Sequence, residues 1–349
     1  MTDLTSAPRP APSPAAAAGA GTVDTAGSTG RRLAGVQRRV PVLQVLVLTG
    51  LVLYVGAKDG DYTWADLWAP ILLQASFLGI AAAGQTLAIL VGGLDFSIAA
   101  YIVAGNLLTT HLVGLEHWNF AACALIILVI CLLGGGLSGW ACHRFGLEPL
   151  VVTLGMSSVV VGALLGTDSK LVNGAGPGWL QSFTAQGSRT FGLPLPPIIA
   201  AWIILAVVIS VILARTPLGR RLYLAGSGPR AAEIAGISTR RVWTGVYAAS
   251  AVLAGLAGVL LAGFSTGGDT NIGNNYLFPG LAAVIVGGTM MGGRGDYLRT
   301  CLGALIITAL NFVISVLGVN AAASQVVFGA LILATVALYG RERRLRDRV

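Results

Sequence analysis

Long apolar segments separated by short polar connections run through the chain after about its first 40 residues. A helix crosses a hydrocarbon core of about 30 Å with about 20 apolar residues, and several segments approach that length. They lie at residues 42–57, 70–91, 95–113, 119–141, 149–166, 196–214, 242–264, 278–291, 297–317 and 324–340. The first is short for a straight crossing, and the eighth indicates a half-helix or a re-entrant piece. We predict an all-α fold, a polytopic membrane helix bundle of about ten transmembrane segments, some broken at Gly pairs.

The composition excludes an ordinary water-soluble domain. Hydrophobic residues make up 55% of the chain and charged residues 10%, whereas a typical soluble domain has about 25% charged residues. The net charge of +8 comes largely from arginines at the ends of apolar segments, where Lys and Arg set membrane topology. The positive charge therefore indicates a lipid membrane and gives no argument for nucleic acid as a partner.

An even number of crossings places both termini on one side of the membrane. If both termini are cytoplasmic, the connections that carry most of the Lys and Arg residues are cytoplasmic too. This agrees with the rule that cytoplasmic loops carry an excess of Lys and Arg. The predicted external loop at 167–195 is rich in Gly, Ser, Thr, Asn and Pro, which suits either a disordered link or a compact lid. The expected regions are a disordered cytoplasmic tail at 1–40, a transmembrane domain at 41–340 with a cytoplasmic loop at 215–241 and an external loop at 167–195, and a basic cytoplasmic tail at 341–349.

The first candidate for function is a break in an apolar run at Gly92 and Gly93, followed by Asp95 and Ser97. Each glycine costs a helix about 1 kcal/mol relative to Ala, and an Asp in mid-membrane costs about 2.5–3.5 kcal/mol. Both costs fall if the helix breaks near an interface or a wet cavity. These residues then form either a tight cytoplasmic turn capped by Asp95 or a hinge that lines a translocation path.

A similar break follows far downstream at Gly287 and Gly288, after a β-branched run and before an acidic residue, Asp296. Paired breaks in the two halves of a transporter point to its core, so this pair is a second candidate hinge or piece of pore-lining backbone. Two unrelated glycine-rich turns are the alternative.

Small residues four apart also allow close helix packing in lipid. Such pairs are Gly135 with Gly139, Gly162 with Gly166, and Gly288 with Gly292.

The long cytoplasmic loop contains a short predicted helix. Ser227 or Gly228 suits its N-cap, Pro229 its first position and Gly236 its C-terminal end. A helix of barely two turns is not stable alone in water, so we expect this one to dock on a partner. Its alanines have side chains small enough for the helix to enter a groove. The charge of Glu233 would fix the position of the helix in that groove. An ordinary connector is the alternative.

Motifs for catalysis or for metal binding are missing from the sequence. It contains no G-x-x-x-x-G-K-[ST] phosphate loop, no H-E-x-x-H motif and no Cys/His cluster. We therefore expect no catalytic residue, no metal site and no cofactor on this chain, and no enzymatic activity of its own. The four cysteines have no paired spacing and suit small apolar packing.

In four stretches the chain resembles the permease subunits of bacterial ATP-binding cassette importers of the ribose type, the monosaccharide branch. The stretches are 84–97, 147–156, 216–237 continuing into 242–263, and 282–295 followed by 303–334. The resemblance implies a multi-pass permease in the bacterial inner membrane that moves a monosaccharide or a similar small polyhydroxylated solute. It also implies cytoplasmic ATP-binding subunits, an extracytoplasmic solute-binding protein and a second permease copy as partners.

The same resemblance implies that the short loop helix is a coupling helix, held in a groove of the ATPase. The residues that match this element are Arg230, Ala231, Ala232, Glu233, Ile234, Ala235, Gly236 and Ile237. The family usually has a polar or acidic residue where this chain has Arg230, so the partner contact at that position stays open.

Other functions fit parts of the sequence. An ion-coupled secondary transporter needs acidic residues deep in several helices, and Asp95 and Asp296 are the candidates. An intramembrane enzyme needs a nucleophile with a base, or a metal cluster, and the sequence offers no such set. Within the resembled family, nucleosides, branched-chain amino acids and a furanosyl signal are alternative solutes.

Overall fold

The computed structural model describes residues 42–58, 64–167, 174–190, 192–265, 267–292 and 295–318, together with 323, 325, 326, 329, 330 and 333. The chain divides into two compact units, Met1–Val42 and Leu43–Val349. The tails predicted at 1–40 and 341–349 lie outside the described residues, as does most of the segment predicted at 324–340.

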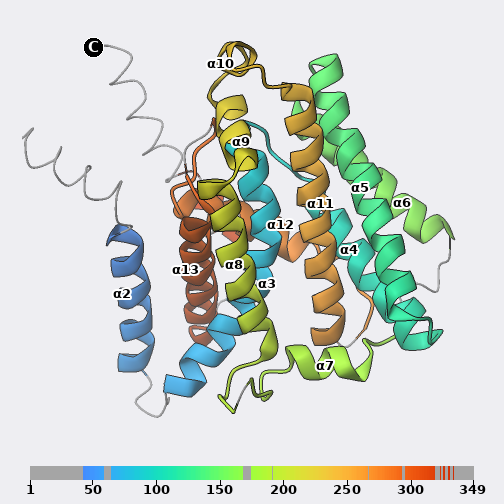
Figure 1. Cartoon of the computed structure of the whole chain (residues 1–349). Helices are drawn as coiled ribbons and strands as arrows, with labels where there is room; N and C mark the ends of the chain where they lie inside the picture. Colours follow the sequence, from blue (N-terminus) through green and yellow to red (C-terminus); the bar gives the residue numbers. More distant parts are fainter. Residues whose placement is uncertain are drawn as a thin grey trace, which may run out of the picture. The chain divides into compact units, whose positions relative to one another are not determined.

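The described residues of the second unit are helical, with no named strand among them, which confirms the all-α prediction (Figure 1). The helices are α2 (Val42–Lys58), α3 (Trp64–Leu90), α4 (Ile98–Leu108) with the π-helix η2 (Thr109–Leu115), α5 (Phe120–Phe145), α6 (Pro149–Thr167), α7 (Gly178–Thr184), α8 (Pro197–Arg215), α9 (Pro217–Ser227), α10 (Pro229–Ile234), α11 (Thr239–Phe264), α12 (Asn274–Val286) and α13 (Tyr297–Val316).

Seven helices within the described ranges are long and apolar enough to cross a membrane. They are α3, α4 with η2, α5, α6, α8, α11 and α13. The helices α2 and α12 are apolar but shorter, and the 13 residues of α12 agree with the expected half-helix. The predicted count of about ten crossings is therefore not reached among the described residues, because two segments are short and the last lies mostly outside them.

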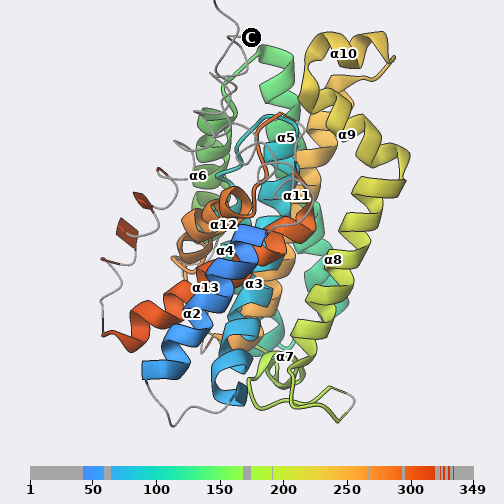
Figure 2. The same ribbon diagram turned by 90° about the vertical axis from the view of Figure 1, so that its left-hand side faces the viewer.

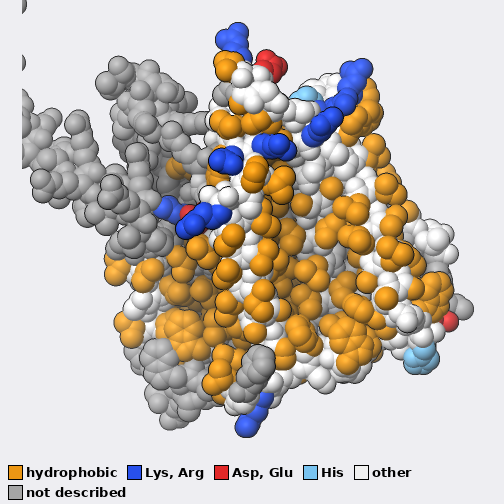
Figure 3. Space-filling model, in the orientation of Figure 1, with side chains coloured by type: hydrophobic (Ala, Val, Ile, Leu, Met, Phe, Trp, Pro, Cys, Tyr) orange, Lys and Arg blue, Asp and Glu red, His pale blue; other side chains and the backbone are white. Residues whose placement is uncertain are grey.

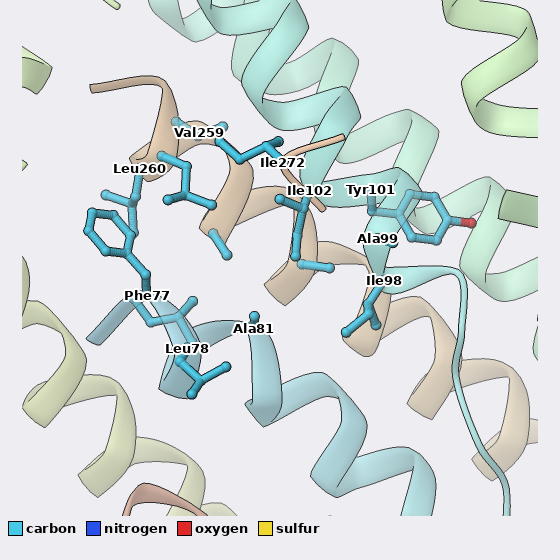
Figure 4. Packing of buried hydrophobic residues seen from close by; sticks show 14 of the residues in the cluster. Phe77, Leu78, Ala81, Ile98, Ala99, Tyr101, Ile102, Val259, Leu260 and Ile272 are labelled. Carbon is cyan, nitrogen blue, oxygen red and sulfur yellow. The ribbon is translucent and has the colours of Figure 1, made fainter. Parts of the chain in front are cut away.

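Three helices, α3, α4 and α11, form the interior of this unit. Every residue of α4 is buried, and α11 packs most extensively against α5, α4 and α3. Figure 4 shows Phe77 from α3, Ile102 from α4 and Leu260 from α11 in this core. By contrast, α5, α6 and α8 expose many Leu, Ile and Val side chains. An apolar outer surface of this kind suits contact with lipid.

Glycines allow α5 to approach α11 closely. A β-carbon added to Gly135 or Gly139 would lie 2.4 or 2.5 Å from the carbonyl oxygen of Tyr247 or Trp243. The close packing predicted for this pair is confirmed. For the pair on α6, added β-carbons would meet nothing within 4 Å among the described residues, so close packing at that pair stays a prediction. The third pair lies after the end of α12, where the chain is no longer helical.

The predicted external loop is folded where the structure describes it. Helix α7 buries Leu180 and Thr184, and a β-carbon on Gly263 of α11 would lie 2.6 Å from the carbonyl oxygen of Leu180. These contacts favour the compact alternative over the disordered link. Figures 1 and 2 place α7 at one end of the long helices and α9 and α10 at the other.

Candidate functional site

The polar loop after α8 contains two helices, where the sequence analysis predicted one. Helix α9 starts with Pro217, and the hydroxyl oxygen of Thr216 accepts a hydrogen bond from the Gly219 N–H at 3.4 Å. Leu222 and Ala225 are buried. Pro at the first helical position after a capping Thr is a helix start signal. That signal, together with apolar residues three apart, was available in the sequence and was missed.

The second helix, α10, begins and ends where the sequence predicts. Pro229 is its first residue. Gly236 has a φ of +67°, and its N–H donates to the carbonyl of Glu233 at 2.9 Å. The Ile237 N–H donates to the carbonyl of Ala232 at 2.9 Å. These two bonds and the positive φ form a Schellman cap, so the predicted end at Gly236 is confirmed.

Helix α10 buries one face and exposes the other. Ala232 is fully buried, whereas the Ile234 side chain is 90% exposed. Arg230 and Glu233 are exposed beside it, as are Ala235 and Gly236. A six-residue helix that holds an isoleucine in solvent carries apolar area that a partner surface would cover favourably.

The first glycine break ends α3 with a tight turn. Gly92 has a φ of +93°, and its N–H donates to the carbonyl of Ile89 at 3.0 Å. The Gly93 N–H donates to the carbonyl of Ala88, also at 3.0 Å. This is again a Schellman cap, in which Gly92 supplies the left-handed residue. The predicted break at this position is therefore present.

The second break ends α12 in the same way. Gly288 has a φ of +90°. Its N–H donates to the carbonyl of Ile285 at 2.9 Å, and the Thr289 N–H donates to that of Val284 at 3.1 Å. The two breaks thus share one cap, but they use their glycine pairs in different registers. The first glycine takes the positive φ in the first break, and the second glycine takes it in the second.

The two breaks contact each other. The Gly292 N–H donates to the carbonyl of Ile89 across 3.4 Å. From α2, the Gln44 side-chain amide donates to the carbonyl of Val286 at 3.1 Å and to that of Gly287 at 3.5 Å. Residues far apart in the sequence therefore meet at one place. Their use as hinges or as pore lining stays a prediction.

Asp95 lies beyond the tight turn of the first break and is buried, with 2% of its surface exposed. Its Oδ1 accepts hydrogen bonds from the main-chain N–H and from the hydroxyl of Ser97. Ser97 occupies the N-cap position of α4 but makes no side-chain cap. The Oδ2 atom of Asp95 and the hydroxyl of Ser250 on α11 are both buried, and the Ser250 hydroxyl interacts with the Asp95 carboxylate. The Asp95 side chain thus orders the chain entering α4.

Three tyrosines that the sequence analysis passed over hold the breaks to neighbouring helices. The Tyr223 hydroxyl on α9 donates to the carbonyl of Gly295 at 2.8 Å. The Tyr247 hydroxyl on α11 donates to the carbonyl of Leu94 at 3.3 Å. A buried tyrosine needs a partner for its hydroxyl, so tyrosines among apolar residues were the signal that was available.

The third of these, Tyr297, is the first residue of α13 and is fully buried. Its hydroxyl donates to the carbonyl of Gly79 on α3 at 2.7 Å and accepts from the Trp202 indole N–H on α8 at 3.2 Å. Three helices are therefore joined next to the second break.

Partial burial and, to a smaller extent, Asp296 raise the pKa of Tyr223, which keeps its phenol protonated and able to donate near neutral pH.

The charges of the described residues are few and lie mainly at one end. Figure 3 shows Lys and Arg side chains gathered over the end that carries α9 and α10. Asp296 is 43% exposed and pairs with Arg299 at 3.3 Å. The described residues include no group of three or more His, Cys, Asp or Glu side chains placed to hold a metal ion.

Comparison with known proteins shows which family the chain matches. The model of a family described as the permease component of branched-chain amino acid transport systems matches residues 68–336. This range contains α10 and both glycine breaks. None of the solved structures matches the chain.

Curated relatives cover most of the chain at moderate identity. A ribose import permease protein of Haemophilus influenzae is 29% identical, covering 83% of this chain and 90% of its own length. A ribose import permease protein of Bacillus subtilis is 33% identical, with coverages of 77% and 83%. A D-allose transport system permease protein of Escherichia coli is 30% identical, with coverages of 77% and 81%.

Proposed function

We propose that this chain, which belongs to the family of branched-chain amino acid transport permease components, is the membrane-spanning permease of an ATP-binding cassette importer. The solute is a monosaccharide or a similar small polyhydroxylated molecule, as the names of the ribose and allose relatives suggest. The chain is a transport subunit of the bacterial inner membrane, and ATP binds to partner chains.

One observation carries the coupling part of the proposal: the folded but incompletely covered helix α10. Its exposed Ile234 directly follows the exposed Glu233 and comes four residues after the exposed Arg230, and a single apolar anchor beside charges suits a groove on a folded partner. A cytoplasmic ATP-binding subunit is that partner. Closure of two such subunits around ATP would displace α10 and thereby tilt the membrane helices.

The orientation follows from charge. We place α9 and α10 in the cytoplasm, because Lys and Arg gather at that end (Figure 3) and cytoplasmic loops carry the positive excess. Helix α7 then lies on the external side, where an extracytoplasmic solute-binding protein would deliver the solute. Both termini are cytoplasmic, and a second permease copy completes the translocation path.

An ion-coupled secondary transporter finds less support. Such a mechanism needs buried carboxylates that bind and release the coupling ion. Of the two candidates, Asp296 is 43% exposed and paired with Arg299, and Asp95 already uses one oxygen to order Ser97. A single buried carboxylate with a local structural role is weak support for ion coupling.

The test is uptake into proteoliposomes. The chain is reconstituted with its ATP-binding subunits and its solute-binding protein, and labelled ribose, fructose and allose are offered with ATP on the cytoplasmic side. We expect accumulation of at least one sugar that requires ATP and all partner chains. Accumulation against a gradient by vesicles that contain this chain alone would contradict the proposal, as would uptake abolished by a protonophore but indifferent to ATP.

A further inference from the structure

We propose that the Tyr223 hydroxyl transmits displacement of α10 to the second glycine break, and through it to the first. Tyr223 is then a positioning residue for coupling, because it touches neither ATP nor solute. This inference rests on the proposed function, since it takes α10 as the element that an ATP-binding subunit moves.

The first step of the path is the short distance along the chain from α10 to Tyr223. Only Gly228 separates α9 from α10, and the two helices contact each other. Leu222, next to Tyr223, is buried, so α9 is anchored on the membrane helices on one side and joined to α10 on the other. A displacement of α10 therefore acts on α9 directly.

The second step is the hydrogen bond from Tyr223 to the carbonyl of Gly295, at 2.8 Å. Gly295 has a φ of +129°, and a β-carbon there would lie 2.5 Å from the Thr289 hydroxyl. The next residue, Asp296, caps α13 by accepting from the Arg299 N–H at 2.9 Å. A shift of Gly295 therefore moves the start of α13.

The third step joins the two breaks and the interior helix α3. The hydrogen bond from Gly292 to Ile89 links the second break to the end of α3. Eight residues after Thr289, the Tyr297 hydroxyl holds the carbonyl of Gly79, also on α3, at 2.7 Å. Both contacts span more than two hundred residues of sequence, so they connect the two halves of the chain.

Hydrogen–deuterium exchange on the assembled importer in nanodiscs tests this path without knowledge of the solute. Exchange is measured with and without a non-hydrolysable ATP analogue, in the wild type, in Tyr223→Phe and in Tyr247→Phe. The last is a matched control, because it also removes one hydroxyl-to-carbonyl bond but on α11. Thermal unfolding of each variant checks that the assembly is intact.

In the wild type we expect the analogue to protect α10 and to change exchange in peptides covering 287–297. In Tyr223→Phe, protection of α10 should persist while the response at 287–297 falls by about fivefold, the population change that one hydrogen bond typically supports. Tyr247→Phe should keep both responses. A purely structural role for Tyr223 would raise exchange at 287–297 equally with and without the analogue.

Two results would overturn the inference, and they are distinguishable. An unchanged response at 287–297 in Tyr223→Phe would remove Tyr223 from the path and leave the proposed function intact. Absence of protection at α10 in the wild-type assembly would contradict the proposed coupling function itself.

Discussion

The main-chain N–H of Gly292 donates a hydrogen bond to the carbonyl of Ile89, and so the loop after α12 is held against the end of α3. The two residues belong to the two glycine breaks, which have the same helix cap. Half-helices and breaks that face each other are typical of transporter cores. Under the proposed function, this contact is one of the links through which a rearrangement of one half of the chain would reach the other.

Replacing Ile234 by Ala should weaken binding of the ATP-binding subunit without affecting the fold. The side chain is 90% exposed in this chain, and burying an isoleucine against a partner contributes about 1.5–3 kcal/mol. Affinity for the purified ATP-binding subunit, measured by biolayer interferometry on nanodiscs, should fall by at least about tenfold. Leu193→Ala, at an exposed position in the connection between α7 and α8, is the control and should bind normally. Equal affinities for the two variants would exclude Ile234 as an anchor.

Replacing Gly92 by Ala should destabilise the protein through backbone strain alone. The φ of +93° disfavours any residue with a β-carbon, while nothing lies within 4 Å of the space that this carbon would fill. The expected loss is about 1–2 kcal/mol, read as a lower midpoint of thermal unfolding in detergent. Gly50→Ala on α2 also fills open space, but in a helix, and should leave the midpoint unchanged or raise it. A midpoint for Gly92→Ala at or above that of the wild type would refute the strain argument.

Asp95 separates the two transport mechanisms. Asp95→Ala removes the acceptor of two Ser97 donors and should cost about 1–3 kcal/mol of stability. Asp95→Asn keeps an oxygen acceptor and removes the ionisable carboxyl group, so ATP-driven uptake should persist with stability close to that of the wild type. Ion-coupled transport through Asp95 predicts the opposite, namely that Asn folds normally and abolishes uptake.

The close contact between α5 and α11 should not tolerate larger side chains. Gly135→Val would place its β-carbon about 2.4 Å from the carbonyl oxygen of Tyr247, and overpacking of this kind costs about 1–3 kcal/mol or more. Gly162→Val on α6 meets open space among the described residues and is the matched control. We expect reduced yield of folded monomer on size-exclusion chromatography for the first variant only, and similar losses for both would contradict the packing argument.

Features determined by neighbouring residues could be predicted from the sequence. The bounds of α10 follow from Pro229 and Gly236, and the long apolar helices follow from segment length. The bond between Tyr223 and Gly295 joins residues 72 positions apart, and no local rule pairs them. The shift in register between Gly92 and Gly288 was hidden for a similar reason, because both sequences contain the same Gly pair and only the backbone decides which glycine turns. Helix α9 was missed because its arginines made the segment appear as a polar connector.

The exposure of Ile234 also bears on how the cell must handle this protein. A subunit inserted in the membrane before its ATP-binding partner arrives presents a bare isoleucine to the surrounding solution, where chaperones and proteases survey apolar surface. Surplus copies should therefore be degraded faster than assembled ones. Because α10, a helix of six residues, exposes this side chain, the cell would need to synthesise the subunits in balanced amounts.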